Sequence, residues 1–139
     1  SPRRGRAAGL NIVPTSTGAS ESVCAVIPNL TGKIDGISVR VPVVDGSLID
    51  LTADLKKPFD EKKLNEVLKK AAKKYPKLIE YSTDELVSTD ILGNTHSAIV
   101  DSLMTRKEGS LAKVLAWYDN EWGYSNRVVD VLEMLNKFK

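Results

Sequence analysis

Apolar residues recur at helical spacing in three stretches of the chain, which predicts three helices. The first begins at Thr17-Gly18 and ends at Pro28. The second, over 60–74, is the clearest, because lysines cover the rest of its surface and Asp60 can act as its N-cap. The third begins at about Trp122. The apolar stripes are Ala19, Val23, Val26 and Ile27 in the first, Leu64, Val67, Leu68 and Ala71 in the second, and Val128, Val131, Leu132 and Leu135 in the third.

Alternating apolar and polar positions predict five strands, over 34–41, 47–55, 85–92, 97–105 and 111–118. In the first strand, Ile37, Val39 and Val41 share one face, whereas Ser38 and Arg40 share the other. In the second strand, Ile49, Leu51 and Ala53 are expected to be buried.

Strands outnumber helices and follow one another in consecutive runs, so the expected fold class is α+β. The sheet should be largely antiparallel and mixed, with helices packed on one face. A chain of 139 residues suits one compact domain with a single hydrophobic core, so we expect residues 1–139 to form a single domain.

Composition excludes several classes of function. Hydrophobic residues make up 42% of the chain and charged residues 27%, which indicates a soluble globular protein. The net charge of +2 gives no general argument for nucleic acid or a membrane as a partner, and the three arginines Arg3, Arg4 and Arg6 add little to an RNA-binding hypothesis. No run approaches the roughly 18 apolar residues of a membrane span. With one cysteine, Cys24, no internal disulfide is expected, and a reducing, cytoplasmic location fits best.

Cys24 and His96 are the most obvious pair of reactive side chains, since a thiol beside an imidazole can form a thiolate nucleophile. Against this, Cys24 lies in the middle of a predicted helix, where a free cysteine usually acts as a small buried hydrophobe. One His and one Cys also cannot supply the three or four protein ligands that zinc takes, so no metal site is expected.

The segment around Thr17-Gly18 is a candidate anion site. It places hydroxyls and a glycine at a helix start, where free backbone N–H groups and the helix dipole attract negative charge. Arg40 projects from a strand and adds a guanidinium that matches phosphate oxygens. The alternative is that Thr17 only caps the helix and Arg40 forms a surface ion pair; the residues alone favour neither.

A second candidate site lies where a strand passes into the last helix, in the aromatic and amide-rich segment 117–127. The amide of Asn120 can exchange paired hydrogen bonds with a carboxamide, and Tyr124 offers a flat face for stacking. An aromatic corner of the hydrophobic core is the alternative, and composition alone favours it.

Five blocks of residues resemble the glyceraldehyde-3-phosphate dehydrogenase family, in that family's order and spacing and over almost the entire chain. They are Arg3-Arg4-Gly5-Arg6-Ala7-Ala8, residues 11–19 (Asn11 to Ala19), Val39-Arg40-Val41-Pro42, Val87-Ser88-Thr89-Asp90, and residues 117–130 (Trp117 to Asp130). The last block is highly specific.

The resemblance implies a role for several of these residues. It implies that Thr17 and Gly18 bind substrate or inorganic phosphate together with Arg40, and that Arg4 lies near a substrate phosphate. It also implies that Asn120 holds the nicotinamide carboxamide of NAD and that Tyr124 packs beside the nicotinamide ring. The substrate would be a phosphorylated aldehyde. The family is tetrameric, so a homo-oligomer is expected. Residues 1 to about 10 resemble part of the segment that packs across a subunit interface in the family, and the last helix would return to a groove of the nucleotide-binding domain.

The sequence also departs from the family pattern. The family's catalytic cysteine lies in a Ser-Cys-Thr-Thr-Asn-Cys stretch, and its catalytic histidine follows later. Neither stretch occurs in these residues, so Cys24 and His96 do not take those roles and no catalytic residue is assigned. The glycine-rich dinucleotide fingerprint is missing as well. We therefore expect a substrate-side domain that is inactive by itself, or alternatively a non-catalytic interaction module. The choices between NAD and NADP, and between glyceraldehyde and erythrose phosphates, stay open.

Overall fold

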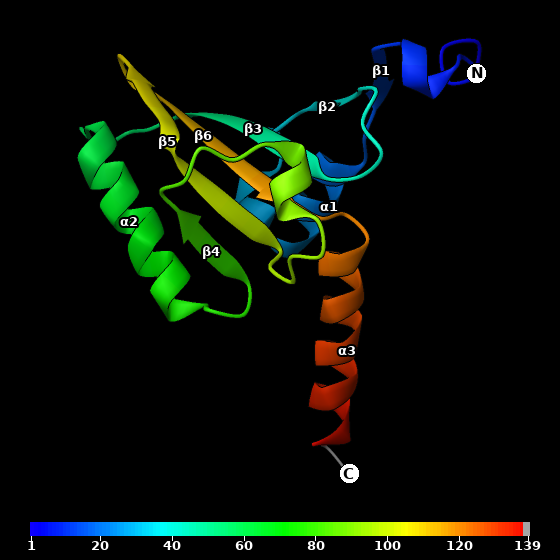
Figure 1. Cartoon of the computed structure of the whole chain (residues 1–139). Coiled ribbons are helices and arrows are strands. Elements are labelled where there is room, and N and C mark those ends of the chain that lie inside the picture. The colour runs from blue at the N-terminus through cyan, green and yellow to red at the C-terminus, as the bar shows by residue number, and fades with distance from the viewer. Residues whose placement is uncertain (138–139) are drawn as a thin grey trace. The chain divides into compact units, whose positions relative to one another are not determined.

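A computed structural model describes residues 1–137 of the chain, which form two compact units (Figure 1). The first unit comprises residues 1–44, and the second continues from Asp45. None of the helices among the described residues is long and apolar enough to cross a bilayer.

The first unit is built on a two-stranded antiparallel ribbon of β1 (Val13–Ser16) and β2 (Ile37–Arg40). Short 3-10 turns, η1 (Ala8–Leu10) and η2 (Pro28–Leu30), flank β1 and the helix α1 (Ala19–Val26). The predicted helix is confirmed, and it ends just before Pro28, which cannot donate an N–H to continue the helix. Strand β1 was not predicted, because it has only four residues and contains a proline.

The second unit is a four-stranded mixed sheet in the order β3-β6-β5-β4. The strands are β3 (Ser47–Asp54), β4 (Ile79–Ser82), β5 (Ala98–Glu108) and β6 (Leu111–Tyr118). All neighbouring pairs are antiparallel except β4 and β5, which are parallel. Helix α2 (Glu61–Lys74) packs against β4 and β5, and α3 (Trp122–Asn136) follows β6 (Figure 1). The predicted α+β class with a largely antiparallel mixed sheet is confirmed.

The predicted N-cap of α2 is also confirmed. The Asp60 carboxylate accepts a 2.7 Å hydrogen bond from the backbone N–H of Lys63. This hydrogen bond is the main reason why the pKa of Asp60 lies below its usual value. Favourable cap chemistry therefore coincides with the most strongly amphipathic segment of the chain.

One predicted strand, over 85–92, is wrong, because residues Ser88–Ile91 form the 3-10 turn η3. The Asp90 carboxylate accepts a 2.7 Å hydrogen bond from the backbone N–H of Val87, which closes the turn locally. Ile91, only 1% exposed, anchors the turn in the core. The strand that joins the sheet instead is β4, which is only four residues long and depends on β5 for its pairing.

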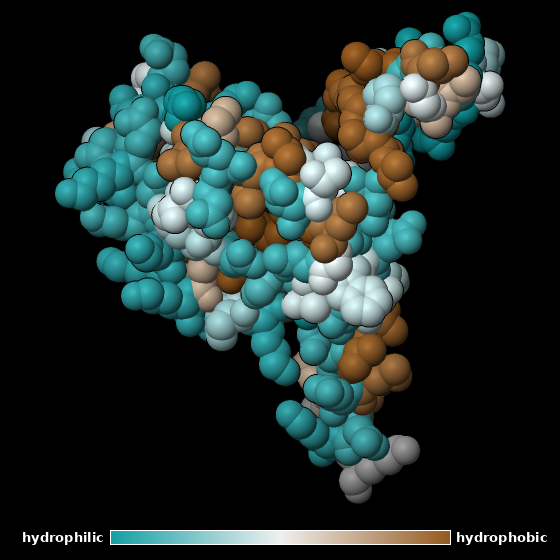
Figure 2. Space-filling model, viewed as in Figure 1, coloured by the Kyte–Doolittle hydropathy of each residue, from teal (hydrophilic) through white to brown (hydrophobic). Residues whose placement is uncertain are grey.

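The hydrophobic core of the second unit is small and centres on Ile91, Ile99, Val100 and Ala112. Contrary to expectation, Ile49 is 50% exposed and Leu51 is 45% exposed, because no second layer of the described part of the second unit covers their side chains. The apolar stripe of α3 is exposed as well, and Figure 2 shows apolar residues along this helix. Large apolar surfaces on β3 and α3 are thus left without a partner within the described part of the second unit.

Candidate functional site

The β1–β2 ribbon positions the basic residues of the first unit. In its register Val13 lies opposite Arg40, and Thr15 lies opposite Ser38. Residues directly opposite each other in an antiparallel pair share a face, so all four of these side chains project from the same side of the ribbon. The predicted grouping of Arg40 with Ser38 on one face of its strand follows from this arrangement.

This face of the ribbon forms the floor of a hollow of about 250 Å³. The guanidinium-bearing side chains of Arg4, Arg6 and Arg40 line it, together with Ala8, Asn11, Val13, Thr15 and Val41. None of the three arginines forms an ion pair with a carboxylate among residues 1–137. The hollow therefore gathers positive charge that the described residues leave uncompensated, as a binding site for an anion would.

Thr17 and Gly18 lie at the other end of β1. The Thr17 hydroxyl accepts a 3.2 Å hydrogen bond from the backbone N–H of Ala19, the first residue of α1, whereas the N-cap position itself is Gly18, which has no capping side chain. The backbone at Gly18 is open, because a Cβ added there would meet no atom within 4 Å. Thr17 is four residues beyond Val13, the partner of Arg40, which corresponds to roughly 13 Å along a strand. The structure does not bring Thr17 and Gly18 into the hollow that Arg40 lines.

Arg4 lies between these two positions. It lines the hollow with Arg40, and its Nη2 atom is 3.5 Å from the carbonyl oxygen of Ser16, the residue before Thr17. Of the predicted anion-binding residues, the structure thus places Arg4 with Arg40 and extends Arg4 toward the Thr17 end of β1.

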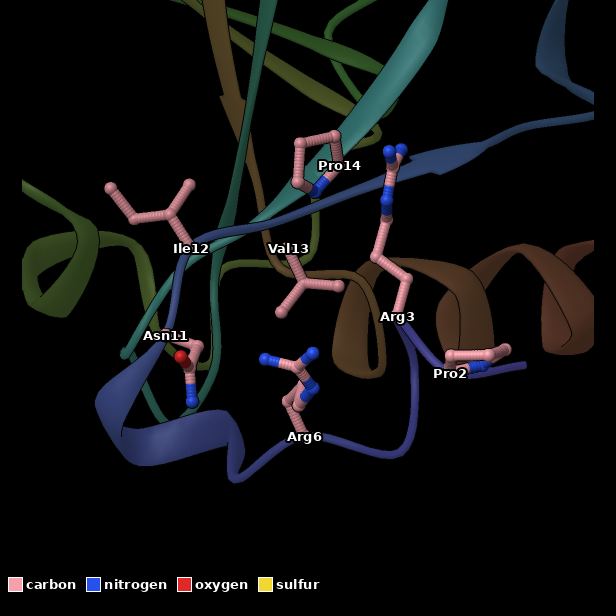
Figure 3. Close-up of a pocket in the computed structure, with 7 residues that line it drawn as sticks. All are labelled: Pro2, Arg3, Arg6, Asn11, Ile12, Val13 and Pro14. Carbon is pink, nitrogen blue, oxygen red and sulfur yellow. The ribbon is translucent and has the colours of Figure 1, made fainter.

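A neighbouring hollow of about 420 Å³ lies on the other side of Arg6 (Figure 3). Its lining consists of Pro2, Arg3, Arg6, Asn11, Ile12, Val13 and Pro14. Figure 3 shows the guanidinium of Arg6 directed between Asn11 and Val13, whereas that of Arg3 points toward Pro14. Arg6 is the arginine that the two hollows share.

The second candidate site is the turn between β6 and α3, and Asp119 organises it. This side chain is 4% exposed. Its carboxylate accepts hydrogen bonds from the backbone N–H groups of Trp122 at 2.7 Å, Gly93 at 2.8 Å and Glu121 at 3.0 Å. Burial raises the pKa of Asp119, but these three N–H groups lower it by more, so the pKa lies below its usual value. Asp119 thereby fixes the start of α3 against the loop at Gly93.

Asn120 is exposed in this turn, and its side-chain oxygen accepts a 3.1 Å hydrogen bond from the Ser47 hydroxyl. The side-chain NH₂ group of Asn120 makes no hydrogen bond with the residues described, so it can donate to a ligand. Tyr124, in the first turn of α3, is 70% exposed. Gly123 packs closely on the loop before β5, because a Cβ at this position would lie only 2.9 Å from the carbonyl oxygen of His96.

Within the second unit, His96 is already engaged on both sides of its ring. Both ring nitrogens of His96 are engaged within its own unit, Nδ1 with Asn94 Oδ1 at 2.8 Å and Glu80 Oε2 at 3.1 Å, and Nε2 with the carbonyl oxygen of Pro76 at 3.0 Å. Cys24 is half-buried in α1. Among residues 1–137, no group of three or more His, Cys, Asp or Glu side chains is placed to hold a metal ion.

Sequence reasoning missed three contributors to these sites. The buried Asp119 had a signal in the sequence, since an Asp between a strand and a helix often accepts hydrogen bonds from the first helical N–H groups. Ser47, which holds Asn120, is 73 residues away in the chain and had none. Arg6 was noted only as part of a basic segment, because nothing local indicates that it reaches β1.

The fold and the two clusters define the class of the protein: an α+β protein with a guanidinium-lined hollow and an amide-bearing turn at a helix start. The family model described as glyceraldehyde 3-phosphate dehydrogenase, C-terminal domain, matches residues 1–120. The chain belongs to this family.

Similar proteins support the assignment. The chain is 51% identical over 136 residues to a glyceraldehyde-3-phosphate dehydrogenase of Mycobacterium avium, and this alignment covers 97% of this chain and 40% of the relative. It is 51% identical over 139 residues to the protein of the same name from Borreliella burgdorferi, and this alignment covers 97% of this chain and 42% of the relative. The identity to the protein of the same name from Kitasatospora aureofaciens is 49% over 135 residues, which covers 96% of this chain and 41% of the relative. The chain thus spans about two fifths of the length of these relatives.

Proposed function

We propose that this chain is the substrate-side part of an NAD-dependent, phosphorylating glyceraldehyde-3-phosphate dehydrogenase. The whole enzyme would convert glyceraldehyde 3-phosphate, NAD and inorganic phosphate to 1,3-bisphosphoglycerate in glycolysis, in the cytoplasm. The observation that carries the proposal is the hollow in which Arg4 and Arg40 lack a carboxylate partner among the described residues. A guanidinium fork can donate two parallel hydrogen bonds to phosphate oxygens, which makes such a cluster a phosphate site.

Two anion positions along β1 fit the geometry better than one. Arg40 contributes to the first, in the hollow, whereas Thr17 and Gly18 contribute to the second, at the start of α1, where the free N–H groups of the helix and its dipole favour an anion. Arg4 reaches toward both. A reaction that joins a phosphorylated substrate and inorganic phosphate requires two such positions, which supports the proposal.

Asn120 and Tyr124 would contact the nicotinamide of NAD. The free NH₂ group of Asn120 can donate a hydrogen bond to the carboxamide oxygen, while Ser47 holds the other end of the amide in place. The exposed ring of Tyr124 offers a flat surface beside it. NAD would supply the hydride acceptor, and the role of these residues is to orient the ring, because misplaced reactants lose rate steeply.

A polypeptide of these 139 residues is expected to have no dehydrogenase activity by itself. Covalent catalysis requires a nucleophile, its base and the cofactor held together, and both ring nitrogens of His96 are already engaged with Asn94 and Pro76. The measurement is the absorbance of reduced NAD, followed over time with glyceraldehyde 3-phosphate and inorganic phosphate present. Substrate-dependent reduction that disappears in the Cys24→Ser variant would refute this expectation.

Replacing Arg40 by alanine is expected to weaken the binding of inorganic phosphate by about 10- to 100-fold, since a charge-assisted hydrogen-bond pair is lost. Isothermal titration of the chain with phosphate measures the effect. Lys33→Ala is the matched control, because Lys33 belongs to the same unit but donates to the Asn29 carbonyl oxygen and does not line the hollow. Equal losses in both variants would mean that only net charge matters and would count against the proposed site.

A non-catalytic assembly module is the second candidate function, and the exposed apolar residues of β3, such as Ile49 and Leu51, favour it. A homo-oligomer, a tetramer in the whole enzyme, would cover such a surface. The two functions are separable by sedimentation. Self-association that survives Arg40→Ala while phosphate binding is lost supports the enzyme domain; self-association with no phosphate affinity in the unmodified chain supports the module alone.

A further inference from the structure

We propose that Arg6 is a third guanidinium of the hollow lined by Arg4 and Arg40, and that this hollow therefore selects a doubly charged phosphate group over singly charged anions. The inference rests on the proposed phosphate-binding function. It adds a residue that determines which anion is bound.

The ribbon and the segment before it place Arg6 at the hollow. Its guanidinium points between Asn11 and Val13 (Figure 3), and Val13 lies directly opposite Arg40 in the ribbon. Local hydrogen bonds hold the segment that carries Arg6. The Asn11 amide donates to the Ala7 carbonyl oxygen at 2.8 Å, and the Leu10 N–H donates to the same oxygen at 3.2 Å. Arg6 therefore approaches Arg40 from an ordered turn.

The excess of positive charge in the first unit favours an anion in this hollow. Residues 1–44 contain two acidic side chains, Glu21 and Asp35, and neither lines the hollow. Asp35 instead accepts a 2.7 Å hydrogen bond from the Gly36 N–H. Three guanidinium groups around one hollow repel each other, and a dianion relieves that repulsion more than a monoanion does.

The shape of the hollow favours a small, compact anion. Its volume of about 250 Å³ accommodates one phosphate group with its first waters, and Ala8, Val13 and Val41 form apolar walls. Apolar walls reduce screening by water and strengthen charge-assisted hydrogen bonds. A planar guanidinium can also donate two parallel hydrogen bonds to a phosphate, which a lysine in place of Arg6 would not supply.

The test compares Arg6→Ala with Arg3→Ala in the 139-residue chain, titrated with inorganic phosphate, glycerol 3-phosphate and nitrate at constant ionic strength. The two variants lose the same charge from the same segment, but Arg3 points toward Pro14 and does not line the hollow. We expect Arg6→Ala to weaken phosphate binding about tenfold or more and to leave nitrate affinity within about twofold. Arg3→Ala is expected to change either affinity by less than about twofold, because Arg3 does not line the hollow and water and salt screen its exposed charge.

The remaining outcomes separate this inference from the function on which it rests. Equal effects of Arg6→Ala and Arg3→Ala, while Arg40→Ala still weakens binding, would overturn the role of Arg6 and leave the phosphate site standing. Absence of phosphate binding in the unmodified chain would overturn both. Arg6→Lys, which keeps the charge and the fold, provides the second variant: full phosphate affinity in it would refute the need for a guanidinium fork. Binding of glycerol 3-phosphate as tight as that of inorganic phosphate would assign the hollow to phosphate esters.

Discussion

Gly46→Ala is expected to destabilise the second unit by about 3–5 kcal/mol, because two unfavourable effects coincide. Gly46 has φ = +87°, which L-residues with a side chain rarely adopt. A Cβ at this position would also lie 2.9 Å from the carbonyl oxygen of Ser88 and 3.1 Å from Ile91 Cδ1. Both contacts involve parts of η3 that cannot move freely, since Ile91 is anchored in the core. Urea denaturation, followed by circular dichroism, measures the change.

Gly93→Ala is the matched control for this prediction. Gly93 has a similar φ of +75°, but a Cβ there would meet no atom within 4 Å. It should therefore cost only the backbone strain, about 1–2 kcal/mol. If the two variants lose the same stability, the close packing of Gly46 against η3 is not significant. Because Ser47 follows Gly46 and holds Asn120, Gly46→Ala is also expected to loosen the Asn120 turn, which Gly93→Ala should do less.

Asp119→Asn is expected to destabilise the chain by about 3 kcal/mol. The carboxylate accepts three backbone hydrogen bonds, and an amide replaces one acceptor oxygen by a donor that faces a buried N–H group. Asp50→Asn is the control: Asp50 pairs with Lys113 at 2.7 Å on the surface, and such pairs contribute at most about 1 kcal/mol. Similar losses in the two variants would show that the buried hydrogen bonds of Asp119 do not stabilise the fold.

The same carboxylate predicts a pH dependence. The folded-state pKa of Asp119 is lowered from 3.8, so at acidic pH the unfolded chain binds more protons at this residue than the folded chain does. Its contribution to stability is complete above the unfolded pKa of 3.8 and is lost as the pH falls through the lower folded pKa. The unmodified chain should thus lose more stability than Asp119→Asn does as the pH falls below about 4. Parallel stability curves for the two proteins would contradict this assignment.

The periodic spacing of apolar residues predicted most of the secondary structure. The amphipathic stripe and the Asp60 cap located α2, and the alternation of residues 111–118 located β6, because both patterns are local properties of the chain. The 85–92 prediction failed where side-chain hydrogen bonding by Asp90 favours a turn over a strand. Strand β4 was not predicted, because its four residues form a strand only through pairing with β5, and a pattern within four residues does not indicate that pairing.

For the candidate site, too, the sequence predicts some properties and only the tertiary structure shows the others. The sequence by itself determined which residues belong to the blocks that resemble the family, namely Thr17, Gly18, Arg4, Arg40, Asn120 and Tyr124. It also determined the chemistry of these side chains, since residue type sets charge and hydrogen-bonding capacity. Only the tertiary structure decided their grouping. The β1–β2 register places Arg40 beside Val13 and away from Thr17, the turn at Asn11 brings Arg6 to the same hollow, and Ser47 reaches Asn120 across 73 residues. Such proximities depend on strand pairing between distant segments, which local spacing does not encode.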